Sequence, residues 1–157
     1  KYMIQRIQSL YLLLTTLLSL LFLKGGFLSF AEKPGSVIKI TFNSIIRESG
    51  IQSPELIDKI WPLSLLIIFI LVLSLITIFL FKKRIIQLWL VRILILLVIA
   101  FIIASVLYSY IILTKYNAEI IPGFKMVIPV IQLILSILAY RGIRKDDALV
   151  KSYDRLR

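Results

Sequence analysis

Two long apolar runs joined by a short basic segment constrain the fold of this chain more than any other feature. Residues 61–81 contain no charged side chain, Lys82, Lys83 and Arg84 follow, and a second apolar run extends over residues 85–113. A helix of about 20 residues is roughly 30 Å long, which matches the hydrocarbon core of a bilayer. Because only a short basic segment separates the two runs, they must lie antiparallel, and we predict a transmembrane helical hairpin.

The composition supports a membrane protein and excludes several kinds of chemistry. Hydrophobic residues make up 60% of the 157 residues and the mean hydropathy is +0.99, whereas soluble domains contain about 45–50% apolar residues. The sequence contains no cysteine and no histidine, which excludes disulfides, thiolate chemistry, zinc sites built on these residues and imidazole catalysis. We therefore expect no catalytic residue, no metal and no cofactor.

Two further apolar stretches flank the hairpin. The first covers about residues 7–30 and contains a single charge, Lys24; a cleavable signal peptide is the alternative interpretation of its basic start and apolar core. The last covers about residues 122–143. The segment between Lys125 and Arg141 would span only about 22 Å as a helix, so the last membrane span must begin before Lys125 or let that side chain reach outward.

The predicted architecture is an all-α membrane protein with four transmembrane helices in up-down-up-down order, a four-helix bundle. It forms a single domain over residues 1–157, with a periplasmic loop at 32–60 and a cytoplasmic tail at 144–157. The predicted spans are about 7–30, 61–81, 85–113 and 122–143.

The polar loop at 32–60 carries weak local signals. Residues 37–42 place apolar side chains at every second position, as a short strand would, and residues 44–51 can return against them as a small β-hairpin. Ser53 and Pro54 are typical of a helix start, so we expect a helical turn before the second span. The loop either packs its apolar face on the helix ends, which we favour, or offers a small site for a partner.

The tail is predicted to be a separate amphipathic helix that lies against the membrane or a partner. Gly142 suits the C-cap of the preceding helix, and Asp146 and Asp147 suit the start of a new one.

Two weaker features concern helix packing. Ala100 and Ala104 are four residues apart, a spacing that lets membrane helices approach closely. Gln132 is the only amide of the last apolar stretch, and we expect it to form an interhelical hydrogen bond.

The distribution of charge predicts the orientation in the membrane. If both termini and the basic segment lie on one side, that side carries twelve Lys and Arg and three Asp, a net charge of +9, whereas the other side carries seven basic and five acidic residues, a net charge of +2. Lys and Arg are enriched on the cytoplasmic side of membrane proteins. We therefore place both termini in the cytoplasm, with Trp89 and Tyr140 at the inner boundary, and expect no nucleic-acid partner.

Three segments of the sequence resemble one protein family. They are residues 3–11 (MIQRIQSLY), 82–87 (KKRIIQ) and above all 138–157 (LAYRGIRKDDALVKSYDRLR). They are similar to cytoplasmic-side motifs in a family of small four-span bacterial inner-membrane proteins catalogued as a domain of unknown function, and the similarity covers the whole chain. Asp147 stands where that family commonly has Glu. The resemblance implies a multi-pass protein of a Gram-negative inner membrane, and it implies no activity and no site residues.

All three segments fall on the predicted cytoplasmic side, where some of their polar side chains can meet: Arg6, Gln8, Arg84, Gln87, Arg141 and Arg144, with Asp146, Asp147 and Asp154 as counter-charges. The basic surface that these residues form has two interpretations. It serves only to fix the orientation in the membrane, which we favour, or it is a docking surface for a partner. Arg92 lies about two turns past the basic segment and either reaches back to the headgroups, which we favour, or is a buried functional arginine. The candidate residues for contact with a partner or with lipid headgroups are Arg6, Arg84, Arg92, Arg141, Arg144, Asp146, Asp147, Asp154 and Arg155.

Three classes of function remain, of which we expect the first. It is a non-catalytic accessory or assembly subunit of an inner-membrane complex, whose partners are membrane lipids and other integral membrane subunits. The second is a small transporter, channel or lipid-interacting protein, although the apolar runs contain no Asp or Glu of the kind that ion-coupled carriers use. An intramembrane enzyme is least supported, because it needs a metal cluster, His or a carboxylate pair. The oligomeric state stays open.

Overall fold

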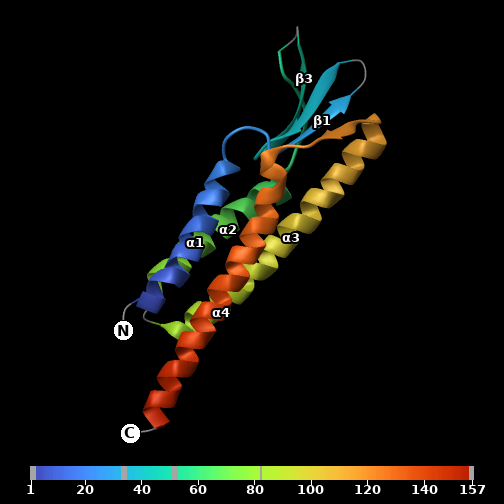
Figure 1. The fold of residues 1–157 in the computed structure, drawn as a ribbon. Helices are drawn as coiled ribbons and strands as arrows, with labels where there is room; N and C mark the ends of the chain where they lie inside the picture. The colour runs from blue at the N-terminus through green and yellow to red at the C-terminus, as the bar shows by residue number, and fades with distance from the viewer. Residues whose placement is uncertain (1–2, 33–34, 51–52, 82, 156–157) are drawn as a thin grey trace.

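The computed structural model describes residues 3–32, 35–50, 53–81 and 83–155, and it includes the side chains of those between residues 7 and 149. Within these ranges four helices lie along the long axis of the molecule, and a five-stranded sheet occupies one end (Figure 1). In chain order the elements are α1 (Met3–Leu21), β1 (Leu28–Glu32), β2 (Ser36–Ile40), β3 (Ser44–Ser49), β4 (Glu55–Lys59), α2 (Trp61–Phe79), α3 (Arg84–Tyr116), β5 (Glu119–Ile121), the 3₁₀ helix η1 (Phe124–Val127) and α4 (Ile128–Arg155).

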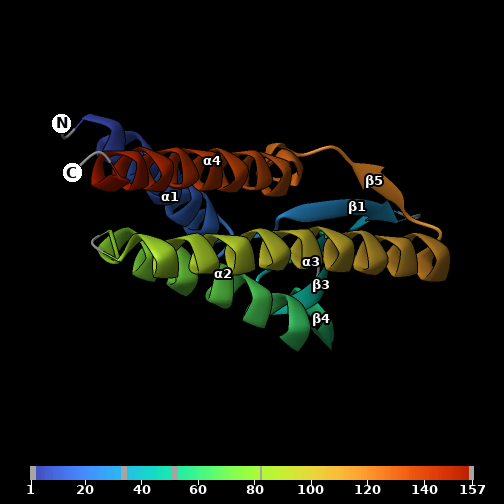
Figure 2. The same cartoon turned by 90° about the horizontal axis from the view of Figure 1, so that it is seen from below.

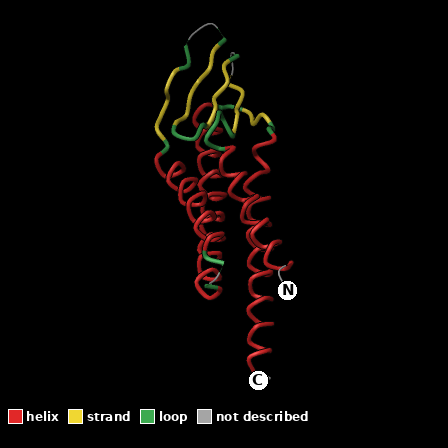
Figure 3. The backbone as a smooth tube through the Cα atoms, turned by 90° about the vertical axis from the view of Figure 1, so that its left-hand side faces the viewer, coloured by secondary structure: helices red, strands yellow, loops and turns green. Residues whose placement is uncertain are grey.

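The helices pack side by side in a closed arrangement. α1 packs mainly against α2 and α4, and α3 packs mainly against the same two helices. Both ends of the chain and the turn between α2 and α3 lie at the end opposite the sheet (Figure 2), which we call the basic end. α4 continues well past the other helices at this end (Figure 3). The segments with the predicted cytoplasmic motifs therefore come together in space.

The sheet is antiparallel throughout, with the strand order β4-β3-β2-β1-β5. Leu28 of β1 pairs with Ile40 of β2, and Phe30 pairs with Ile38. All four side chains are buried in the same core as the helices, because alternate residues of a strand point to the same face. The hairpin of β2 and β3 confirms the strand pattern read from the sequence at 37–42.

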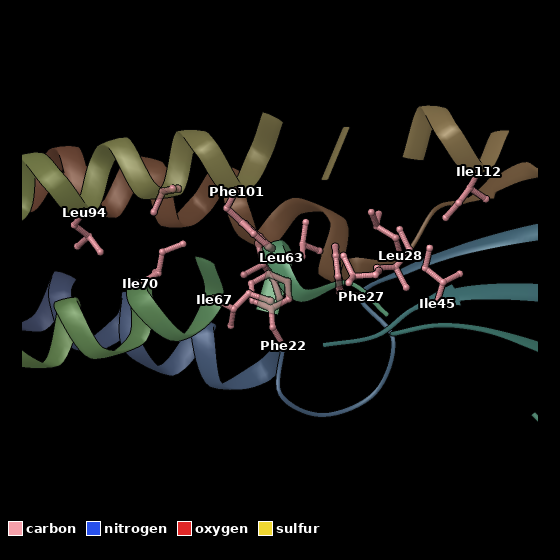
Figure 4. Packing of buried hydrophobic residues seen from close by; sticks show 14 of the residues in the cluster. Phe22, Phe27, Leu28, Ile45, Leu63, Ile67, Ile70, Leu94, Phe101 and Ile112 are labelled. Carbon is pink, nitrogen blue, oxygen red and sulfur yellow. The ribbon is translucent and has the colours of Figure 1, made fainter. Parts of the chain in front are cut away.

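One buried core continues from the sheet into the helices (Figure 4). At its centre the rings of Phe22, Phe27 and Phe101 lie with centroids 5.5, 5.3 and 5.9 Å apart. Two of the three pairs meet edge to face, an arrangement that aromatic rings favour. These rings join the end of α1, the start of β1 and the middle of α3, so the sheet and the helices form one packed unit.

The helix α3 is long enough to pack against both the other helices and the sheet. Its 33 residues measure about 50 Å, which exceeds a hydrocarbon core by about 20 Å. Ile112, near its C-terminal end, is buried beside Leu28 and Ile45 of the sheet (Figure 4). The helix ends at Tyr116. The next residue, Asn117, adopts the left-handed conformation with φ of 45°, as residues after a helix often do. The last turns of α3 therefore support the sheet.

The predicted all-α class is wrong, because strands form where hydropathy indicated helix or loop. β1 occupies residues assigned to the first span, and its neighbour β5 lies between the third and fourth predicted spans. β4 replaces the helical turn expected after Pro54. The chain leaves α1 at Leu21 because two glycines follow, and Gly25 has φ of +69°, a conformation that glycine adopts without strain.

The predicted number of spans is also wrong. Among the described residues, three helices are long and apolar enough to cross a membrane, namely Trp61–Phe79, Arg84–Tyr116 and Phe124–Leu149. The apolar part of α1, Ile7–Leu21, is only about 22 Å long. The four-span architecture is therefore corrected to three candidate spans and one shorter apolar helix, which ends early because the chain turns into β1.

Several predictions about helix ends and helix packing can be compared with the structure. α4 is continuous from Ile128 to Arg155, so the separate tail helix is wrong and Gly142 is not a C-cap. Gln132 donates a hydrogen bond from Nε2 to the Ser19 hydroxyl of α1 over 2.9 Å, which confirms the interhelical bond. Ala100 is exposed, so the pair of alanines on α3 is not the point of close approach between helices.

Candidate functional site

The candidate residues lie toward the basic end of the helices. The structure describes the side chains of six of the nine, namely Arg84, Arg92, Arg141, Arg144, Asp146 and Asp147. The remaining three, Arg6, Asp154 and Arg155, belong to the ends of α1 and α4, and their side chains lie outside the described residues.

Three of the helices meet in a polar contact at this end, which we call the polar junction (Gln8, Arg84 and Asp146). Gln8 of α1 donates a hydrogen bond from Nε2 to the Asp146 carboxylate of α4 over 2.6 Å. Arg84 of α3 donates from Nη1 to the Asp146 backbone carbonyl over 3.2 Å. Gln8 and Asp146 are only 5% and 7% exposed, so water cannot replace these bonds easily. The polar junction fixes α4 at the point where it leaves the other helices.

A glycine makes the polar junction sterically possible. A Cβ atom added to Gly142 of α4 would lie 2.8 Å from Cγ of Gln8, which is closer than non-bonded carbons approach. Gly142 stands one helical turn before Asp146, so it lies on the same face of α4. Its missing side chain lets Gln8 cross α4 and reach the carboxylate. The close approach of helices expected at the alanine pair occurs here instead.

A second glutamine ties α2 to α3 beside the polar junction. The buried Gln87 donates from Nε2 to the Thr77 carbonyl over 3.1 Å. A pocket of about 10 Å³ lies between Gln87 and the polar junction, and this is room for about one water molecule. The pocket is too small for an organic substrate, so the contacts at this end connect helices rather than enclose a ligand.

The cations of α4 beside the polar junction face outward. Arg141, Arg144 and Lys145 are exposed, and Asp147 is half-buried. The structure thus brings Arg84 and Asp146 together and leaves Arg141 and Arg144 free to meet solvent, lipid headgroups or a partner. Exposed guanidinium and ammonium groups of this kind bind carboxylates and phosphates.

Arg92 forms a distinct cluster with two aromatic residues, about 12 Å along α3 from Arg84. Its guanidinium donates from Nη2 to the Tyr140 hydroxyl over 3.1 Å. The guanidinium carbon lies 5.2 Å from the ring centroid of Trp89 and 5.5 Å from that of Tyr140, distances at which a cation is attracted to an aromatic ring. Arg92 is exposed, so the interpretation as a buried arginine is wrong.

The sheet contains an ion-pair cluster that the sequence did not reveal. Arg47 of β3 contacts Glu32 of β1 through two nitrogens, at 2.8 and 2.9 Å, and also contacts Glu55 at 3.5 Å and the ring of Tyr116. The hydrogen bond that Arg47 donates to the Glu32 carboxylate raises the pKa of Arg47 above its ordinary value. The partners of Arg47 are distant from it in sequence, which is why no local pattern indicated the cluster. Their contacts hold β3 against β1, β4 and the end of α3.

The described side chains at the basic end offer groups that can bind anions. No group of three or more Asp and Glu that could hold a metal ion occurs among the described residues. The sequence did not reveal the close approach of Gln8 to Gly142 or the contact of Tyr140 with Arg92. The charge pattern pointed to the correct end of the molecule, but it could not show which side chains touch.

Comparison with curated proteins and with solved structures finds no match. Comparison with protein families matches residues 4–156 to a family described as a domain of unknown function (DUF4293). The match includes every described helix and strand except the first residue of α1. Because it covers nearly the whole sequence, this chain belongs to the DUF4293 family of proteins, whose function is unknown.

Proposed function

We propose that this protein is a non-catalytic accessory or assembly subunit of a complex in the bacterial inner membrane. The observation that carries the proposal is the exposed pair Arg144 and Lys145 on α4, which stands beside the polar junction, just before α4 projects beyond the other helices (Figure 3). α4 is fixed at this point, because Gln8 of α1 and Arg84 of α3 both donate hydrogen bonds to Asp146. Exposed cations on a helix that is fixed in this way are suited to an acidic surface on a partner.

The apolar exterior of the helices supports insertion into a membrane. Leu65 and Phe69 of α2 and Leu96 of α3 are 51%, 55% and 65% exposed, and water-soluble monomers rarely display continuous surfaces of such side chains. Trp89 and Tyr108 of α3 are separated by about 28 Å of helix, which matches the spacing of the aromatic belts at the two faces of a bilayer. The sheet then stands outside the hydrocarbon core.

The polar side chains between the helices support a structural role. The hydroxyls of Thr16 on α1 and Ser74 on α2 share a hydrogen bond of 2.8 Å, and Gln132 of α4 binds Ser19 of α1. Contacts of this kind stabilise helix association in membranes. These groups are engaged with one another, as expected of a scaffold.

The proposed orientation places the basic end in the cytoplasm and the sheet in the periplasm, following the excess of Lys and Arg at the basic end. The chain contains no cysteine, so single cysteines can report on each side. In spheroplasts we expect a membrane-impermeant maleimide to label Lys59→Cys on β4, and to label Lys145→Cys on α4 only after the membrane is opened. Labelling of Lys145→Cys in intact spheroplasts would contradict this orientation.

Charge reversal tests the role of the exposed cations of α4 beside the polar junction. The double variant Arg144→Glu and Lys145→Glu should lose the larger assembly that the wild-type protein forms, because both side chains are exposed and their reversal repels an acidic partner. The measurement is native electrophoresis of membranes extracted in mild detergent. The matched control, Lys24→Glu with Lys59→Glu, changes the net charge equally at the sheet end, where both side chains are also exposed, and should leave the assembly intact.

Two results would argue against an accessory role. One is migration of the wild-type protein as a single chain. The other is an assembly that contains only copies of this chain, which co-expression of two differently tagged copies would reveal.

A further inference from the structure

The cluster of Arg92, Trp89 and Tyr140 is distinct from the polar junction, and the accessory role makes no use of it. Arg92 and Trp89 are exposed on the outer surface of α3, and Tyr140 reaches them from α4. Two aromatic rings and one hydroxyl hold the guanidinium in place. The cluster therefore presents a positioned cation on a surface that is otherwise apolar.

The positive charge of Arg92 is paired with no carboxylate among the described residues, which favours binding of an anion from outside the protein. Its hydrogen-bond partner among the described residues is the neutral Tyr140 hydroxyl, and the described salt bridges all lie in the sheet. A guanidinium has five N–H donors, so most of its donors stay open to a ligand. Ile93 and Leu96, its neighbours on α3, are 44% and 65% exposed, and an apolar surface on a helix long enough to cross a membrane is suited to lipid chains.

The depth of the cluster matches that of a lipid phosphate. Arg92 stands three residues beyond Trp89, which is only about 4–5 Å further along the helix. Tryptophan marks the level of the headgroups in membrane proteins, and a long arginine side chain reaches back to that level. The planar guanidinium pairs with two phosphate oxygens at once.

We propose that Arg92, held by Trp89 and Tyr140, binds the phosphate of an anionic phospholipid in the inner leaflet. This inference rests on the membrane placement proposed above and does not depend on a protein partner. An anionic lipid is favoured over a zwitterionic one because its phosphate carries no ammonium group, which the cations of the basic end would repel.

Tryptophan fluorescence of the purified protein in vesicles tests the proposal. The sequence contains two tryptophans, so Trp61→Phe leaves Trp89 as the reporter. We expect brominated phosphatidylglycerol to compete for the site about five-fold better than brominated phosphatidylcholine, as read from quenching. Arg92→Gln should abolish the preference and Arg92→Lys should reduce it, because lysine keeps the charge but loses the paired contact. In the control, Trp89→Phe, the remaining Trp61 should show no dependence on Arg92.

The outcomes separate this inference from the proposed function. Equal quenching by the two lipids, or a preference that survives Arg92→Gln, would overturn the phosphate site alone. Loss of the preference when millimolar inorganic phosphate is added would assign the site to a soluble phosphate and overturn the lipid assignment. Absence of quenching by either lipid would overturn the membrane placement as well. The result of the charge-reversal experiment on Arg144 and Lys145 does not change the interpretation of any of these quenching results.

Discussion

Replacing Phe101 by alanine is expected to lower the free energy of unfolding by about 3–5 kcal/mol, the largest effect of any single truncation considered for this chain. Phe101 is fully buried and its ring contacts both Phe22 and Phe27. Truncation would leave a cavity where the helices meet the sheet, and the loss of packing contacts is felt in lipid as it is in water. Unfolding in detergent, followed by circular dichroism, measures the change.

The matched control for this prediction is Phe79→Ala on α2. Phe79 is 76% exposed, so the same truncation removes few protein contacts and should change the free energy of unfolding by less than about 1 kcal/mol. Equal losses for the two variants would contradict the assignment of Phe101 to the core. They would show instead that the stability of the protein depends on the total apolar surface, wherever it lies.

Local signals were sufficient for the parts of the fold that depend on neighbouring residues. The long apolar runs on either side of Arg84 identified α2 and α3, since hydropathy over 20 residues is a property of the segment itself. The alternation at residues 37–42 identified β2 because a strand has a period of two. The lone amide at Gln132 indicated a helix contact because a buried amide needs a partner.

The remaining strands could not be predicted, because they are defined by their partners. Leu28 and Phe30 continue an apolar run, so hydropathy alone cannot distinguish β1 from the end of a helix. β5 has only three residues, and it is a strand because Ile120 pairs with Phe30, which is distant in sequence. The helical turn predicted from Pro54 failed for the same reason, since pairing with β3 outweighed a local helix start.

The candidate site was predictable only as a region. Charge patterning placed Arg84 and Asp146 at one end of the molecule, and both are there. The sequence motifs placed Gln8 in the same region, but they could not show that Gln8 donates to the Asp146 carboxylate, because the two residues are 138 positions apart. The capping preference of glycine predicted a helix end at Gly142, which is the commonest setting for glycine after an apolar helix. The structure shows a glycine in mid-helix instead, and its role can be tested directly.

Substitutions at Gly142 should destabilise the protein although they improve the helix. In an isolated helix Gly→Ala is stabilising by about 1 kcal/mol. Here the new Cβ would lie 2.8 Å from Cγ of Gln8, so we expect Gly142→Ala to cost about 1–2 kcal/mol and Gly142→Leu about 3 kcal/mol through overpacking. Gly123→Ala is the control, because its added Cβ would meet nothing within 4 Å and should change stability little.

A double-mutant cycle identifies the cause of this loss. Gln8→Ala alone should cost about 1–3 kcal/mol, because it leaves the buried Asp146 carboxylate without its donor. Combined with Gly142→Ala it also removes the atom against which the new methyl collides, so the double variant should be about 2 kcal/mol more stable than the sum of the single changes. Additive losses would mean that α1 and α4 do not approach closely at Gly142. The polar junction would then not fix the projecting part of α4, and the rigid helix on which the proposed docking depends would lose its support.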